Sequence, residues 1–220
     1  MLKCINSKYK LVFYSFVMET LKLKHPFTML VAGPTGSGKT HYVKKLVDHR
    51  MIHPFPKTVL WCYGAYQTLY EEMQGIEFYE GIPSNLNQYS DTLIIIDDLM
   101  SELGNDSKLT KLFTKGSHHR NISVIFLVQN IFHKGKEMRD ISLNSHYLVL
   151  FKNPRDRSQV MHLGRQLYPS KVKFFQESYE DATSKPFSYL LVDLKSNTDD
   201  SLRMRSGMFP GDKYWVYQPR

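Results

Sequence analysis

The stretch from Gly33 to Thr40 constrains the chain most, because it reads Gly-Pro-Thr-Gly-Ser-Gly-Lys-Thr and follows an apolar run, Phe27 to Ala32. A strand, a glycine-rich turn and a helix in this order form a P-loop, which holds phosphate at a helix N-terminus. The glycines let the backbone approach phosphate oxygens closely, with successive N–H groups pointing inward. A glycine-rich turn that merely closes a β-α unit is the alternative, but it does not explain the Lys and Thr that follow in register.

The residues of this loop have different expected roles. Lys39 would place its ammonium on the β and γ phosphates of a nucleotide, and Thr40 would offer its hydroxyl to Mg²⁺. The predicted phosphate-binding residues are Gly33, Pro34, Thr35, Gly36, Ser37, Gly38, Lys39 and Thr40.

Apolar runs along the chain predict the remaining strands of the fold. They lie at 28–32, 58–62, 92–96, 122–128, 146–151 and 188–192, and one more strand is expected at 11–17. Helices are expected from Lys39 onward and at 67–73, 109–113, 156–167 and 171–179. Near-continuous apolar strands separated by helices predict an α/β fold, with a parallel sheet covered by helices on both faces.

Two carboxylates, Asp97 and Asp98, end the apolar run at 92–96. Carboxylates at the end of so apolar a strand are costly unless they meet a cation. We expect Asp97 to hold Mg²⁺ through water opposite Thr40, and Asp98 to act as the base that orients an attacking water. A helix cap or a solvated turn is the alternative role for Asp98.

Polar residues flank the run at 122–128. Gln129 follows it, at the sheet edge where ligands bind in open α/β folds, and is expected to contact the γ-phosphate or the water. The alternative for Gln129 is a loop-facing amide. Arg120 precedes the run, and in a ring of subunits it could reach a neighbour's γ-phosphate as an arginine finger. A surface salt bridge is the other interpretation of Arg120, with Arg155 and Arg157 as second choices for the finger.

The net charge of +8 favours a polyanionic partner, because unpaired Lys and Arg attract phosphate backbones. Lys134-Gly135-Lys136 is a candidate DNA-contacting loop, with a solvated basic loop as the alternative. No apolar run approaches the roughly 20 residues of a membrane span, and no small-residue cleavage site follows Leu11 to Met18. The chain is therefore expected to have no membrane partner and no signal peptide.

The cysteine count is low, with only Cys4 and Cys62 in the chain. Two cysteines so placed favour a reducing, intracellular compartment. The adjacent pair His118-His119 lies far from both, so the ligand spacing of a zinc site is missing.

Three features together resemble the FtsK/HerA superfamily of DNA-pumping ATPases: the P-loop, the strand that ends in Asp97-Asp98, and the stretch from His119 to Asn130. Within it, the chain looks like the packaging ATPases of Polinton/Maverick elements, virophages and related viruses, akin to the poxvirus packaging ATPase. The runs at 25–30, 189–195 and 202–205 share this likeness, which covers roughly residues 25 to 210. The P-loop is common to many families, whereas the Arg-to-Gln pattern with the tail is far more specific.

The resemblance implies a RecA-like (ASCE) core with strand order 5-1-4-3-2 and a hexamer-like homo-oligomeric ring with ATP sites between subunits. It also implies that ATP hydrolysis drives double-stranded DNA into a capsid, so that the partners are DNA and a capsid or procapsid vertex. The chain matches the motif positions of the family at the residues Lys39, Thr40, Asp97, Gln129 and Arg120. Asp98 departs from the pattern, because many members carry Glu there, and the shorter acid requires a closer backbone or another water position.

On this basis we expect an N-terminal extension at 1–25, a P-loop ATPase domain at 26–195 and a C-terminal tail at 196–220. Met1 or Met18 could be the start of translation. The expected location is the host nucleus or a cytoplasmic virus factory, with association to the virion as a further option. A small-molecule kinase and a non-hydrolysing nucleotide-binding scaffold are the alternative functions.

Overall fold

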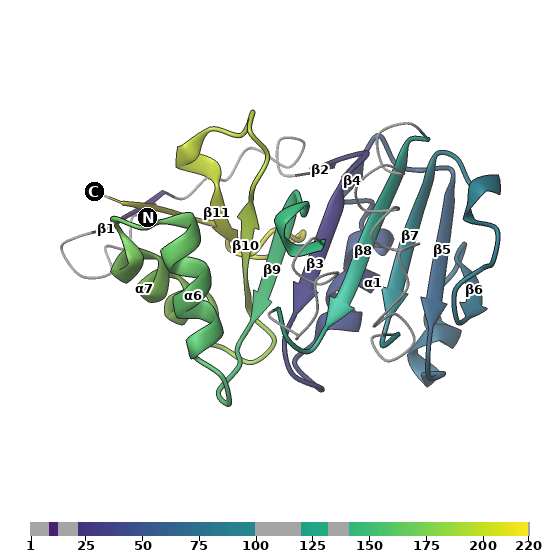
Figure 1. Ribbon diagram of the computed structural model, residues 1–220, viewed down its shortest axis with the longest axis horizontal. Helices are drawn as coiled ribbons and strands as arrows, with labels where there is room; N and C mark the ends of the chain where they lie inside the picture. The colour runs from purple at the N-terminus through teal and green to yellow at the C-terminus, as the bar shows by residue number, and fades with distance from the viewer. Residues whose placement is uncertain (1–8, 13–21, 100–119, 132–140, 220) are drawn as a thin grey trace.

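The computed structural model describes residues 9–12, 22–99, 120–131 and 141–219, and most strands in these ranges belong to one ten-stranded sheet (Figure 1). β2 (Leu23–Lys24) and β4 (Ile52–His53) form a separate parallel pair. The predicted helix at 109–113, His118-His119 and the basic loop at 134–136 lie outside the described residues.

The parallel part of the sheet carries the P-loop. Its strands are β3 (Thr28–Ala32), β5 (Thr58–Tyr63), β6 (Glu77–Glu80), β7 (Thr92–Asp97), β8 (Ile122–Val128) and β9 (Tyr147–Phe151). They lie in the order β9-β3-β8-β7-β5-β6, and every neighbouring pair is parallel. The first five reproduce the order 5-1-4-3-2, so the predicted fold class is confirmed.

An antiparallel part extends the sheet beyond β9. It consists of β10 (Tyr189–Asp193), β11 (Met204–Ser206), β12 (Trp215–Pro219) and β1 (Tyr9–Val12). The sequence predicts no strand in the C-terminal tail at 196–220, which is wrong for β11 and β12. Met204 and Val216 are fully buried, and Arg205 pairs with the buried Asp193 at 3.0 Å. Pairing of β11 with β10, and of β12 with β11, therefore makes strands of segments that are short and mixed in polarity.

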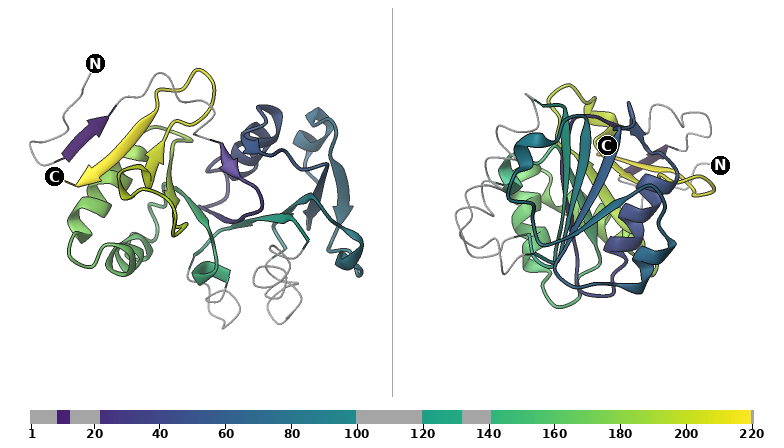
Figure 2. Two further views of the ribbon diagram at one scale, coloured as in Figure 1. Left: turned by 90° about the horizontal axis from the view of Figure 1, so that it is seen from above. Right: turned by 90° about the vertical axis from the view of Figure 1, so that its right-hand side faces the viewer.

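Helices cover both faces of the sheet, as Figure 2 shows. α1 (Lys39–Asp48) lies on one face, where its buried stripe consists of Tyr42, Val43, Leu46 and Val47, as the helical spacing predicts. α6 (Ser158–Leu167) and α7 (Val172–Ala182) pack on the other face. Within the described ranges, no helix combines the length and the apolar character needed to span a membrane.

Short 3₁₀ turns complete the described structure: η1 (Thr68–Glu72), η2 (Leu86–Gln88) and η4 (Asp200–Leu202). η1 replaces the α-helix that the sequence predicts at 67–73. Tyr70 explains the difference, because its ring packs 5.0 Å from Phe78 and 5.6 Å from Trp61, between centroids. With this one side chain anchored in the core, the segment forms a single turn, and a single turn is too short for a stable α-helix.

A buried polar cluster fixes the start of β3 against β8. His25 Nδ1 lies 2.6 Å from Ser123 Oγ, which also accepts the Phe27 N–H at 3.0 Å. His25 Nε2 lies 3.4 Å from an oxygen of Asp91. The imidazole is almost fully buried, and this burial lowers its pKa, although the Asp91 charge acts in the opposite direction.

This cluster predicts a loss of stability in mild acid. The pKa of His25 is lower in the folded chain than the 6.5 of an ordinary histidine, so the unfolded chain binds the proton more tightly. Stability from the neutral imidazole is thus present above pH 6.5 and is lost as pH falls through the folded pKa. Urea denaturation of the wild type and His25→Gln across this window should show a shallower pH dependence in the variant. His53→Gln, an exposed control, should keep the wild-type slope; identical slopes for His25→Gln and wild type would contradict the assignment.

Candidate nucleotide site

The P-loop joins β3 to α1 at the carboxyl edge of the parallel strands. Its first residue, Gly33, donates its N–H to the Val128 carbonyl at the end of β8, at 3.1 Å. Gly36 and Gly38 have φ values of 76° and 102°, in the left-handed region that favours glycine. At Gly33, an added Cβ would lie 2.7 Å from Phe151 Cβ, so the turn has no room for a side chain.

Lys39 is held over the loop that precedes it. Its Nζ donates to the carbonyls of Gly33 and Pro34, at 2.8 and 3.1 Å. Burial lowers the pKa of this ammonium, while the charges of Asp97 and Asp98 act in the opposite direction. Because burial disfavours the charged form of this side chain, an anion bound in the site would stabilise the ammonium.

Asp97 ends β7 with only 4% of its surface exposed. Its Oδ2 accepts hydrogen bonds from Thr40 Oγ1 at 3.3 Å and from Tyr70 Oη at 3.2 Å. Burial raises the pKa of this carboxyl, although both hydrogen bonds and the charge of Lys39 favour its ionised form. A buried carboxylate beside a hydroxyl offers the oxygen ligands that Mg²⁺ prefers, so these residues fit the cation.

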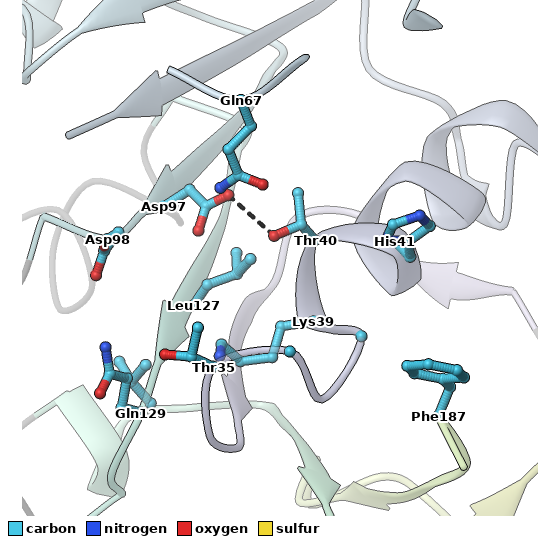
Figure 3. Close-up of a pocket in the computed structure, with 13 residues that line it drawn as sticks. Thr35, Lys39, Thr40, His41, Gln67, Asp97, Asp98, Leu127, Gln129 and Phe187 are labelled. Carbon is cyan, nitrogen blue, oxygen red and sulfur yellow. Dashed lines mark hydrogen bonds between the residues drawn. The ribbon is translucent and has the colours of Figure 1, made fainter. Parts of the chain in front are cut away.

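A cleft of about 360 Å³ opens over these groups and brings together most of the predicted site (Figure 3). Lys39, Thr40, Asp97, Asp98 and Gln129 all line it. Its remaining lining residues are Thr35, Gly36, Gly38, His41, Gln67, Leu127, Val128 and Phe187. Residues from β3-α1, β7 and β8 meet here because parallel strands end at one edge of the sheet.

Asp98 and Gln129 lie in the cleft with exposed side chains. Asp98 has a φ of 56°, so the chain turns sharply as it leaves β7. Gly64, at the end of β5, permits this turn, since an added Cβ would lie 2.6 Å from the Asp98 carbonyl oxygen. Both side chains can therefore meet a ligand above the strand ends, and their catalytic roles stay predictions.

The arginines predicted as fingers do not line this cleft. Arg120 precedes β8, whose other end carries Gln129, so it lies at the sheet edge opposite to the P-loop. Arg155 and Arg157 lie between β9 and α6, at the P-loop edge, and are exposed. Arg120 can therefore serve only a site on another subunit, and its role stays a prediction.

Four residues of the site escaped the sequence analysis: His41, Gln67, Tyr70 and Phe187. The sequence places His41 directly after the P-loop and Gln67 a few residues after the end of β5, so position alone could have indicated both. Tyr70 and Phe187 reach the site through tertiary packing and the turn before β10. No sequence pattern indicates that either residue belongs to the site.

Solved structures share this fold. The crystal structure of B204, the DNA-packaging ATPase from Sulfolobus turreted icosahedral virus, superposes with a TM-score of 0.55 and 11% identity, over 89% of this chain and 99% of that one. The genome packaging NTPase B204 from Sulfolobus turreted icosahedral virus 2, in complex with AMPPCP, gives a TM-score of 0.54 and 12% identity, over 89% and 98%. The chain has a P-loop NTPase fold. Identities this low establish the fold and nothing finer.

Sequence comparison adds a short match. The chain is 35% identical over 60 residues to packaging protein 1 of snake adenovirus serotype 1, which is 27% of this chain. The matched segment spans 14% of that protein's length. No model of a protein family matches the chain.

The crowding at Gly33 predicts a specific effect of Gly33→Ala. The added methyl group should destabilise the fold by about 1–3 kcal/mol and displace the loop, which weakens binding of inorganic tripolyphosphate. Thermal denaturation and calorimetric titration measure the two effects. In Gly75→Ala, where the Cβ meets nothing within 4 Å, only the positive φ is strained, and tripolyphosphate binding should be unchanged. Wild-type tripolyphosphate affinity in Gly33→Ala would refute this packing argument.

Proposed function

We propose that this protein is an ATPase that moves double-stranded DNA into the capsid of a virus or a virus-like transposon. The observation that carries the hydrolytic part is the convergence of five residues on one cleft: Lys39, Thr40, Asp97, Asp98 and Gln129. Phosphoryl transfer asks a protein mainly to position groups and to stabilise charge, and these side chains supply both.

In the proposed reaction a water oxygen attacks the γ-phosphorus of ATP, and the bond to the β–γ bridging oxygen breaks to give ADP and phosphate. Asp98 orients the water and accepts its proton. Gln129 holds the water or a γ-oxygen from the end of β8. Lys39, released from the carbonyls of Gly33 and Pro34, neutralises charge on the β and γ phosphates.

Thr40 and Asp97 are the residues that would hold Mg²⁺, Asp97 through water. The ion would supply charge neutralisation on the phosphate oxygens. The contribution of the chain is to keep both ligands in place: Tyr70 Oη donates to the Asp97 carboxylate at 3.2 Å, and Thr40 lies in the first turn of α1.

Four observations support DNA packaging as the use of this activity. The chain carries a net charge of +8, which suits a phosphate backbone. Its fold is shared with B204, described as a DNA-packaging ATPase, and a short segment matches an adenovirus packaging protein. The motif resemblance to FtsK/HerA packaging ATPases of Polinton-like elements points in the same direction. The proposed partner is a capsid or procapsid vertex, in the host nucleus or in a cytoplasmic virus factory.

We further propose a homo-oligomeric, hexamer-like ring. Arg120 lies at the edge of the sheet opposite to its own P-loop, where it could contact the γ-phosphate of a neighbouring subunit. An arginine finger delivered between subunits makes hydrolysis depend on assembly.

ATP hydrolysis should be strongly reduced in Lys39→Ala. Removing a charge that stabilises the transferred phosphoryl group should lower kcat by roughly 100-fold or more. Phosphate release is measured with and without double-stranded DNA, which should accelerate the wild type. Lys44→Ala, which removes a lysine paired with Asp48 on the outer side of α1, is the control and should keep wild-type turnover. A folded wild type that hydrolyses no ATP under either condition would refute the proposal.

Arg120→Ala should abolish turnover in the assembled ring. Because the finger would act on a neighbour, mixing Arg120→Ala with Lys39→Ala subunits should restore part of the activity: an intact P-loop then meets an intact arginine at some interfaces. The measurement is the ATPase rate against mixing ratio. A mixture no more active than either variant alone would argue against action between subunits.

A further inference from the structure

Phe187 is a large apolar side chain that the fold leaves in the open. It lies in the turn between α7 and β10, is 70% exposed and lines the nucleotide cleft. Figure 3 shows it beyond the P-loop, on the side away from Asp98 and Gln129. Its ring borders the loop itself, since a Cβ added at Gly38 would lie 3.2 Å from Phe187 Cδ1.

The turn that carries Phe187 holds it in an unfavourable backbone conformation. Ser188 closes the turn, because its N–H and its hydroxyl both donate to the Lys185 carbonyl, at 3.3 and 2.7 Å. Pro186 occupies the second position of this four-residue turn. Phe187 occupies the third with a φ of 61°, where glycine or asparagine is usual. A bulky residue is strained there and gains little from burial, which points to a use of the exposed ring.

The predicted polarity of the P-loop gives the direction of a bound nucleotide. Lys39 serves the β and γ phosphates, and the γ end lies toward Asp98 and Gln129. The α-phosphate and the nucleoside therefore leave the loop on the other side, past Gly38 and the start of α1. His41 and Phe187 line the cleft on that side.

We propose that the ring of Phe187 is the surface on which the nucleobase of the bound nucleotide stacks. This rests on the proposed nucleotide site and adds a base subsite to it. An exposed aromatic ring offers its π-face to any base, so the contact favours the larger purines over pyrimidines through overlap of area and reads no hydrogen-bond pattern. The turn keeps the ring next to Gly38, so the platform is in place before the ligand arrives.

The test separates the base from the phosphates. Calorimetric titrations with ATP and with inorganic tripolyphosphate are run on the wild type, Phe187→Ala and Phe187→Trp. Loss of stacking should weaken ATP binding by about 5- to 100-fold in Phe187→Ala, with unchanged affinity for tripolyphosphate. Phe187→Trp should retain ATP affinity. Tyr79→Ala removes another exposed aromatic, on β6 away from the cleft, and should bind both ligands as the wild type does.

A second variant guards against a folding defect: Phe187→Gly also lacks the ring, but glycine suits the positive φ, and it should match Phe187→Ala. Wild-type ATP affinity in both variants would overturn the stacking. An equal loss for ATP and tripolyphosphate would also overturn it, because Phe187 would then only shape the loop at Gly38. A different result would show that the proposed nucleotide site is itself wrong: Lys39→Ala would then bind ATP and tripolyphosphate as the wild type does.

Discussion

The hydrogen bond between Thr40 Oγ1 and Asp97 Oδ2 joins the two parts of the site that the rest of the fold brings together. Thr40 lies in the first turn of α1, which follows β3, and Asp97 ends β7; β8 lies between those two strands in the sheet. The contact depends on the register, in which Ala32 pairs with Val128 and Asp97 with Leu127. A slip of one residue in the β7–β8 pairing would turn the Asp97 side chain to the other face of the sheet.

Desolvation explains why Lys39 and Asp97 are suited to a charged ligand. Burial lowers the pKa of Lys39 and raises that of Asp97, so both charged forms are costly within the protein. Phosphate oxygens and a divalent cation would relieve both costs at once.

A buried group of aromatic rings packs beneath the P-loop and α1. In it, the ring of Tyr42 lies 4.6 to 6.1 Å, between centroids, from the rings of Phe151, Tyr189 and Phe209.

Sequence patterns predict most of the parallel sheet, where each buried strand is a nearly continuous apolar run. Near-continuous apolar runs predict five strands of the parallel sheet, and the polar residues that follow two of them indicate Asp97 and Gln129. The mostly exposed β6 has no such run, so this pattern does not predict it. β11 could not be predicted, since its three residues include a charged side chain and become a strand through tertiary pairing with β10 and β12, where Arg205 meets the buried Asp193. Tyr70 and Phe187 escaped because tertiary packing and a single turn bring them to the site.

The proposed site depends most directly on Asp97 as the residue that couples Mg²⁺ to ATP binding. The decisive measurement is the ATP affinity of the wild type and of Asp97→Asn, each with and without Mg²⁺. Asparagine keeps the shape and loses the charge, so Mg²⁺ should strengthen ATP binding in the wild type by about tenfold or more and have little effect in the variant. Equal strengthening by Mg²⁺ in both proteins would contradict this role of Asp97.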